Sequence, residues 1–235
     1  MAKKRKLTSS SAKIILVTNQ KGGSAKTTTA MNTAAALHNA GERVLLADYD
    51  PQNTLGSWYG QADDTNPIPF PYLNLSTPSL DVTTELESRQ YDFDYIVIDG
   101  QPNLDLSMSG VLLLSDFVLV PLKPSLADLH STQGMIKEIQ LAQAERPDLK
   151  FALLLVMVKK GTLLLQYTKD AIRELGFPLC KTMVMHRELH PHTYALGHTV
   201  FSNRTLGYRA AAEEATKITE EIINLSLKGA DDGKQ

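Results

Sequence analysis

The sequence predicts an α/β fold, a doubly wound and mostly parallel sheet with helices on both faces. Apolar runs rich in β-branched residues recur along the chain, and uninterrupted runs of this kind are typical of strands buried on both faces of a sheet. Helical patterns lie between these runs, and regular alternation of strand and helix is typical of parallel sheets. The expected strands are residues 13–19, 43–50, 95–100, 117–122 and 151–158.

Three helical patterns separate or follow the strands. Gly41 and Gly176 stand just beyond the first and third patterns, where glycine commonly ends a helix, and Pro147 stops the second. Residues 66–72, NPIPFPY, are expected to form a proline-rich loop. The expected helices are residues 27–40, 126–144 and 163–175.

A further helix is expected near the end of the chain, where residues 211–228 have an amphipathic pattern. Ile218, Ile222 and Leu225 fall on one face of this segment. Its glutamates would be repelled by anionic lipid, which argues against a membrane-surface helix. We therefore expect the helix to pack against the domain and expect no membrane partner.

Length and composition favour one folded domain. The chain has 235 residues, of which 43% are hydrophobic, enough for a sizeable core. We expect a flexible basic arm over residues 1–12, a single domain over 13–228 and a polar tail over 229–235. The lone Cys180 excludes a disulfide framework and favours a reducing, cytoplasmic compartment.

The stretch NQKGGSAKTTT, residues 19–29, predicts a phosphate-binding loop. A strand, a glycine-containing turn and a helix opening with Lys-Thr place backbone N–H groups and the positive end of a helix dipole around an anion. Lys26 can reach β- and γ-phosphate oxygens, and Thr27 can ligate Mg²⁺. The strict pattern GxxxxGK[ST] fails at Gln20 and Ala25, which stand where its glycines belong.

The segment KGGSAKTTT resembles the deviant Walker A box, KGGxGKT[ST], of the ParA/MinD superfamily of P-loop NTPases. The chain is most similar to short ParA-type plasmid partition ATPases without an N-terminal helix-turn-helix. Lys21 matches the signature lysine, and the resemblance implies that it reaches a partner's phosphates in a sandwich dimer. It also implies an ATP cradle made by Lys21, Gly22, Gly23, Ser24, Ala25, Lys26, Thr27 and Thr28.

Ala25 departs from the family pattern. A methyl group there would crowd the N–H groups around the β-phosphate, unless the backbone at Ala25 is already right-handed helical, a conformation that suits alanine. We expect nucleotide binding to survive this substitution and leave its effect on turnover open.

Carboxylates follow two expected strands. The segment DYDPQ, residues 48–52, resembles the DxDPQ motif of the family, which implies that Asp50 orients the attacking water and that Asp48 supports the magnesium shell. The alternative is that both cap the following turn. The run YIVIDG ends in Asp99, the arrangement of a Walker B carboxylate that holds Mg²⁺. The expected catalytic residues are Lys21, Lys26 and Asp50, and the expected metal ligands are Thr27, Asp48 and Asp99.

The net charge of −2 means that any DNA contact must come from a local patch. Between residues 146 and 217 the chain carries eleven Lys or Arg against six Asp or Glu. The resemblance implies that a dimer binds DNA non-specifically through this part, although for each residue singly a solvated charge is the alternative. The proline between His190 and His192 disfavours a metal site there. The candidate DNA contacts are Arg187, Arg204, Arg209 and Lys217.

The resemblance implies a ParA-type ATPase that uses ATP and Mg²⁺. ATP would close a homodimer, the dimer would bind nucleoid DNA, and a ParB-like protein on a cargo would stimulate hydrolysis and release. One alternative is a biosynthetic ATP-dependent ligase or synthase on the same fold, and another is a non-hydrolysing nucleotide-dependent scaffold. The sequence leaves the cargo and the partner open.

Overall fold

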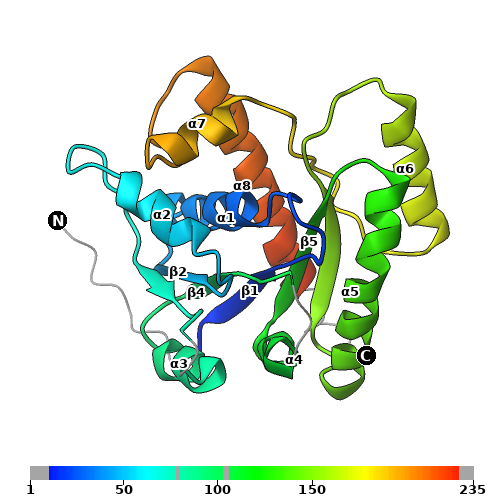
Figure 1. The fold of residues 1–235 in the computed structure, drawn as a ribbon, viewed down its shortest axis with the longest axis horizontal. Helices are drawn as coiled ribbons and strands as arrows, with labels where there is room; N and C mark the ends of the chain where they lie inside the picture. Colours follow the sequence, from blue (N-terminus) through cyan, green and yellow to red (C-terminus); the bar gives the residue numbers. More distant parts are fainter. Residues whose placement is uncertain (1–10, 78–79, 103–105, 228–235) are drawn as a thin grey trace.

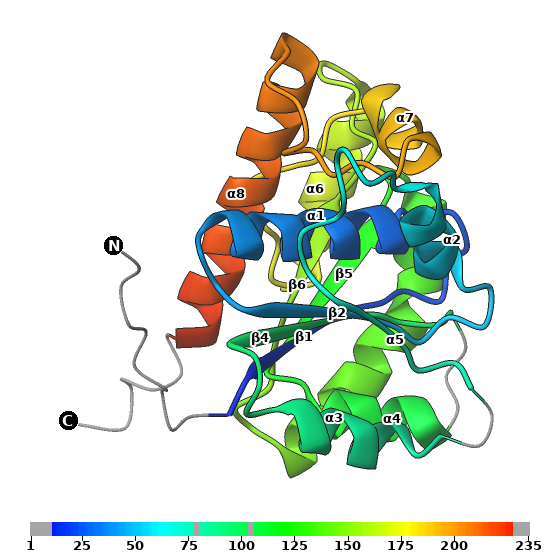
Figure 2. The ribbon, with the colours of Figure 1, turned by 90° about the vertical axis from the view of Figure 1, so that its left-hand side faces the viewer.

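The computed structural model describes residues 11–77, 80–102 and 106–227. Its six strands form one parallel sheet in the order β3-β2-β4-β1-β5-β6, with helices on both faces (Figures 1 and 2). This confirms the predicted fold class. The strands are β1 Lys13–Val17, β2 Val44–Asp48, β3 Tyr72–Asn74, β4 Tyr95–Asp99, β5 Phe117–Leu122 and β6 Lys150–Leu155.

The helices divide between the two faces. One hydrophobic core lies under α3, α4, α5 and α6, and the other lies under α1, α2 and α8. Figure 2 shows α3 and α4 on the opposite side of the sheet from α1 and α2. The helices are α1 Lys26–Asn39, α2 Thr54–Gln61, α3 Val82–Arg89, α4 Leu106–Leu114, α5 Leu126–Glu145, α6 Leu163–Glu174, α7 Leu189–Ala195 and α8 Leu206–Leu227.

The strands are apolar throughout because both faces of the sheet are covered. In β1, Ile14 and Leu16 enter the core under α5, while Ile15 and Val17 enter the core under α1. Successive side chains of a strand point to opposite faces, so a strand with helices on both sides needs an apolar residue at every position. This is the physical reason that uninterrupted runs located the strands.

The sequence placed the long elements to within a few residues. The last helix begins earlier than expected, at Leu206, and its Ile218 and Ile222 are buried against the core under α1, as predicted. The expected basic arm falls largely outside the described residues. Its last residue, Ala12, is instead buried and donates its N–H to the Gln90 carbonyl at 2.6 Å, so the packed domain begins before residue 13.

Short elements escaped the sequence analysis. The proline-rich loop ends at β3, which adds three residues to the edge of the sheet beside β2. The helices α2, α3 and α7 have at most eight residues each, too few for a clear periodicity. Over the described ranges, no helix has the length and apolar character needed to cross a membrane.

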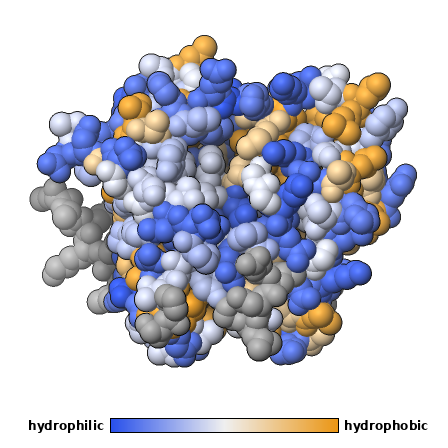
Figure 3. Space-filling view, in the orientation of Figure 1, coloured by the Kyte–Doolittle hydropathy of each residue, from blue (hydrophilic) through white to orange (hydrophobic). Residues whose placement is uncertain are grey.

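The outer face of α6 carries exposed apolar side chains. Leu163, Leu164 and Tyr167 are 73%, 47% and 57% exposed, whereas Leu165 and Ile172 of the same helix are buried in the core. Figure 3 shows apolar surface at the upper right, over α6. The described chain therefore covers only the inner face of this helix.

Candidate nucleotide-binding site

The loop between β1 and α1 is fastened to the neighbouring strand and helix. The side-chain amide of Asn19 donates to the Pro121 carbonyl at 2.8 Å and to the Thr132 hydroxyl at 3.0 Å, and its oxygen accepts the N–H of Lys21 at 3.2 Å. The Gln20 side chain packs over Gly134 of α5, where an added Cβ would lie only 2.5 Å from Oε1. Gln20 therefore anchors the loop at a position where the strict motif has glycine.

Ala25 adopts a left-handed conformation, with φ 61° and ψ 31°. The condition under which alanine would suit this position, a right-handed helical backbone, is not met. A left-handed backbone costs an L-residue about 1–2 kcal/mol, so the missing glycine leaves strain in the loop. Gly23, with φ 68°, has the residue type that its backbone needs.

Lys26, the first residue of α1, is only 8% exposed. Burial lowers the pKa of Lys26, while the Asp99 and Asp50 carboxylates raise it. The structure therefore brings together a buried lysine and the carboxyl ends of β4 and β2, which are far apart in the sequence. An ammonium at the start of a helix is suited to binding phosphate oxygens.

Asp99 ends β4 and is fully buried. Among the described residues, neither of its carboxylate oxygens has a hydrogen-bond partner, and nor does the buried hydroxyl of Ser24. Burial raises the pKa of Asp99 to about 8, while the Thr27 hydroxyl, which lies close by but outside hydrogen-bonding geometry, and the Lys26 ammonium oppose the rise.

Unpartnered buried oxygens at this point fit a magnesium ion that is shared with phosphate. Mg²⁺ prefers hard oxygen ligands and is commonly held by one or two protein side chains together with substrate phosphates and water. Asp99 and Thr27 supply such ligands. No cluster of three His, Cys, Asp or Glu side chains suited to a metal occurs in the described part of the chain.

Asp48, which the sequence predicts to support the metal, ends β2 beside Asp99 of β4. Its carboxylate accepts the N–H groups of Asp50 at 2.9 Å and Leu55 at 3.0 Å. Burial raises the pKa of Asp48 to about 6, and these N–H donors oppose the rise. Asp48 therefore holds the turn between β2 and α2, the alternative that the sequence left open.

Asp50 and Lys21 remain at the surface of the site. Asp50 accepts the N–H of Gln52 at 3.0 Å and is partly exposed, whereas Lys21, Gly22 and Gly23 are exposed. The Lys21 side chain makes no ion pair in the part of the chain that the structure describes. Its exposure agrees with a role outside its own subunit.

Gly100, which follows Asp99, is required by close packing. A Cβ at Gly100 would lie 2.8 Å from Cβ of Thr18, a distance that real Cβ atoms do not tolerate. The Thr18 hydroxyl in turn donates to the Gln101 carbonyl at 3.2 Å. The Asp-Gly pair in this chain is therefore matched to the threonine at the end of β1.

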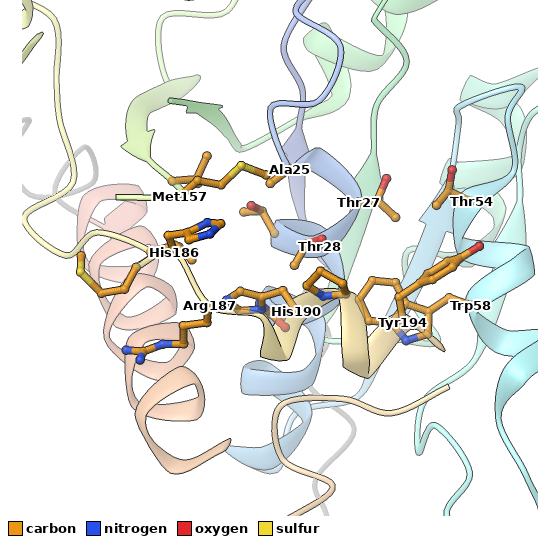
Figure 4. A pocket seen from close by; sticks show the side chains of 16 residues that line it. Ala25, Thr27, Thr28, Thr54, Trp58, Met157, His186, Arg187, His190 and Tyr194 are labelled. Atoms are coloured by element: carbon orange, nitrogen blue, oxygen red, sulfur yellow. The ribbon is translucent and has the colours of Figure 1, made fainter. Parts of the chain in front are cut away.

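A cavity of about 350 Å³ adjoins the loop. Figure 4 shows side chains from α1, α2 and α7 and from the end of β6 converging on it, among them Thr28, Trp58, His190 and Tyr194. The Trp58 ring stacks edge-on against Tyr194 with centroids 5.4 Å apart. Met157, at the rim, has φ 53°, a strained conformation of the kind that clusters at binding sites.

Two polar side chains that line the cavity lack described partners. Oδ1 of Asn32 and both ring nitrogens of His190 are buried without a hydrogen bond within the described residues. Burial, together with nearby Arg187 and His186, lowers the pKa of His190 to about 4. A flat heterocycle with donors and acceptors would satisfy these groups. No local sequence pattern marks Asn32, Trp58, Met157 and Tyr194, which were therefore not predicted.

The four residues predicted to contact DNA have different surroundings in the structure. Arg187 lines the cavity and its guanidinium pairs with Glu214, so its charge already has a partner within the chain. Arg204, Arg209 and Lys217 are exposed. Glu213 lies between Arg209 and Lys217 on the same helical face, so α8 does not carry a purely basic stripe.

Comparison with known proteins shows the family to which this chain belongs. Residues 15–193 match the model of the CbiA family, described as the CobQ/CobB/MinD/ParA nucleotide binding domain. The chain belongs to this family. It is also 32% identical over 195 residues to the maintenance of carboxysome distribution protein A of Halothiobacillus neapolitanus, and this match covers 82% of the chain and 88% of that protein.

Solved structures of the CbiA-family fold include proteins with different tasks. A Cyanothece McdA variant in complex with ATP matches with a TM-score of 0.73 and 16% identity, over 92% of this chain and 98% of that one. Cobyrinic acid a,c-diamide synthase of Mycobacterium smegmatis, with a bound ATP analogue and magnesium, matches with a TM-score of 0.68 and 23% identity, over 87% and 92%. At these identities the likeness concerns the fold alone.

Proposed function

We propose that this protein is a ParA-type positioning ATPase, which hydrolyses ATP with Mg²⁺ to distribute a cellular cargo. The observation that carries the proposal is the meeting of buried Lys26 with Asp99 and Asp50 at the start of α1. The relationship to a carboxysome distribution protein supports the positioning role.

In this proposal the phosphates lie on the loop and the base lies in the adjoining cavity. Residues 21–28 surround the phosphates, and Lys26 binds β- and γ-phosphate oxygens. Thr27 and Asp99 hold Mg²⁺, which supplies charge neutralisation at the transferred phosphoryl group. Asp50 orients the attacking water, and Asp48 fixes the turn that carries Asp50.

The proposed cycle of cargo binding and release begins with the exposed Lys21. We propose that Lys21 reaches the phosphates of a second copy, so that ATP favours a homodimer. Only the dimer then presents enough positive charge, from Arg204, Arg209 and Lys217 of both copies, to hold DNA non-specifically. A cargo-bound, ParB-like partner stimulates hydrolysis and release. The proposed location is the cytoplasm, on the nucleoid.

A DNA-pelleting assay with ATP, ADP and a slowly hydrolysed analogue tests the proposal. Wild type should pellet with ATP and the analogue but not with ADP, and retention should fall as salt rises. Lys21→Ala should abolish pelleting while ATP binding persists. Lys137→Gln, at an exposed position on α5, is the control. Retention that ignores both nucleotide and salt would contradict the DNA step.

The same preparation tests the biosynthetic alternative. A positioning ATPase should hydrolyse ATP without a small-molecule acceptor, and DNA with a partner should accelerate turnover. A screen of carboxylic acids in which one acid accelerates ATP consumption, while DNA has no effect, would instead favour a ligase or synthase.

A further inference from the structure

Lys123 lies beside the phosphate loop, although no motif includes it. It directly follows β5, the neighbour of β1 in the sheet. The end of β5 is tied to the loop, because the Thr18 N–H donates to the Leu119 carbonyl at 3.1 Å and Asn19 donates to the Pro121 carbonyl at 2.8 Å. These bonds fix the point from which the Lys123 side chain departs.

The ammonium group of Lys123 faces the loop itself. A Cβ built on Gly23 would meet Nζ of Lys123 at 3.8 Å, and apart from Gly23 and its two neighbours in the chain no other described residue has an atom within 4 Å of it. Lys123 is half-buried, and within the described residues it has neither an ion pair nor a side-chain hydrogen bond. A half-buried cation without a partner is unfavourable unless an anion joins it.

The position of Lys123 along the loop indicates which phosphate it would meet. The cavity that fits a base is lined by Ala25, Thr27 and Thr28, at the helix end of the loop, and not by Gly23 or Lys123. A nucleotide whose base fills that cavity extends its phosphates along the loop and away from it. Lys123 therefore lies toward the end of the phosphate chain.

The candidate site is rich in carboxylates, so a cation at this position should strengthen the binding of a phosphate group. Asp48 and Asp99 lie opposite each other at the ends of β2 and β4, and Asp50 follows Asp48 two residues later. A nucleoside triphosphate brings further negative charge, even with bound magnesium. Of the two lysines in the sequence motif, Lys26 is buried in the site, whereas Lys21 is exposed and in the proposed function binds the phosphates of a second subunit.

We propose that Lys123 is a third phosphate-loop cation, which binds the terminal phosphate of a nucleoside triphosphate held by the same subunit. Lys123 thereby makes the monomer prefer the triphosphate over the diphosphate before any second copy arrives. This inference rests on the proposed nucleotide site and extends it, since Lys21 acts between subunits and Lys123 acts within one.

The test compares ATP and ADP affinity in the presence of Mg²⁺, using full-length protein that carries Lys21→Ala to remove the cross-subunit cation. Adding Lys123→Gln should weaken ATP binding about tenfold, as expected for one charge-assisted contact, and change ADP binding less than about twofold. Lys123→Arg should retain most of the preference for ATP. Lys137→Gln, an exposed lysine on α5, should change neither affinity.

The outcomes separate the inference from the proposed function. If the wild-type protein binds neither nucleotide, the proposed function fails and the inference fails with it. If the parent binds ATP and Lys123→Gln leaves the ratio of ATP to ADP affinity unchanged, only the inference is overturned. Thermal unfolding without nucleotide shows whether the variant is folded. Should Lys123→Gln be unfolded, Lys123→Met replaces it, with the same expected loss of ATP preference.

Discussion

The phosphate end and the base end of the candidate site are built in different ways. The phosphate end is made by consecutive residues, 19–28, together with carboxylates at the ends of the neighbouring strands β2 and β4. The cavity is assembled from α1, α2, α7, the end of β6 and residues 184–187, which are scattered over the chain. A charge-binding site can therefore be local, whereas an apolar pocket needs the whole fold.

The comparison predicts distinct effects for variants at the two ends. Variants at the phosphate end should change turnover or the preference for ATP over ADP. Variants in the cavity should weaken ATP and ADP alike, because both nucleotides carry the same base. A cavity variant that selectively weakened ATP would contradict this division.

The largest expected effect is that of Lys26→Gln. Removing a preorganised cation from a developing phosphoryl charge should lower the rate of ATP hydrolysis by about 10²–10³-fold. Steady-state phosphate release measures this loss, and the exposed Lys137→Gln serves as the control. The free energy of unfolding should be retained, because burying the charged Lys26 ammonium is itself unfavourable and the variant removes that charge. Turnover that persisted near the wild-type rate would remove Lys26 from the mechanism.

The second prediction concerns pH and the cavity. Because burial lowers the pKa of His190 to about 4 from 6.5, the unfolded chain binds more protons between these values. The contribution of His190 to stability is therefore complete above pH 6.5 and falls by about 2 kcal/mol between pH 7 and 5, whereas the raised pKa values of Asp48 and Asp99 act in the opposite direction. Denaturant unfolding at several pH values measures this slope.

Matched histidine variants isolate that slope from other titrating groups. His190→Gln should remove most of the loss, because glutamine does not titrate. His192→Gln, at an exposed position two residues further along α7, should leave the slope unchanged. Equal slopes in both variants and the wild type would show that His190 is not held neutral.

A smaller effect is expected for Asn32→Leu. The variant removes a buried oxygen that lacks a described partner, so the free energy of unfolding should stay constant or rise by about 1 kcal/mol. ATP and ADP affinities should both fall about tenfold if the oxygen accepts a bond from the base. Calorimetric titration measures both, and Asn39→Leu, at the exposed end of α1, is the control. Increased stability with unchanged affinity would exclude Asn32 from the base site.

The smallest expected effect is that of Ala25→Gly. Glycine tolerates the left-handed backbone at this position, so the variant should gain about 0.5–1 kcal/mol of stability, with little change in the ratio of ATP to ADP affinity. Ala40→Gly, where the backbone is right-handed, should be neutral or slightly destabilising. A loss of stability in Ala25→Gly would show that the loop is not strained there.

The sequence alone predicted five of the six strands, the long helices and a phosphate-binding loop. Strands buried on both faces must be apolar at every position, and a loop that cradles phosphate uses its own consecutive N–H groups, so both leave a continuous pattern. Asp50 and Asp99 were recognised because each follows such a strand. Ala25 was recognised as a departure, but its backbone conformation was not, because that depends on how the loop is anchored.

Only the tertiary structure decided which distant residues share the site. It placed Arg187 against Glu214 in the cavity wall, directed the Asp48 oxygens to a turn, and set the Lys123 ammonium beside Gly23. Each of these outcomes depends on contacts between residues far apart in the chain. The sequence gives the type and charge of each residue. Which other group lies next to a charge depends on how the chain packs.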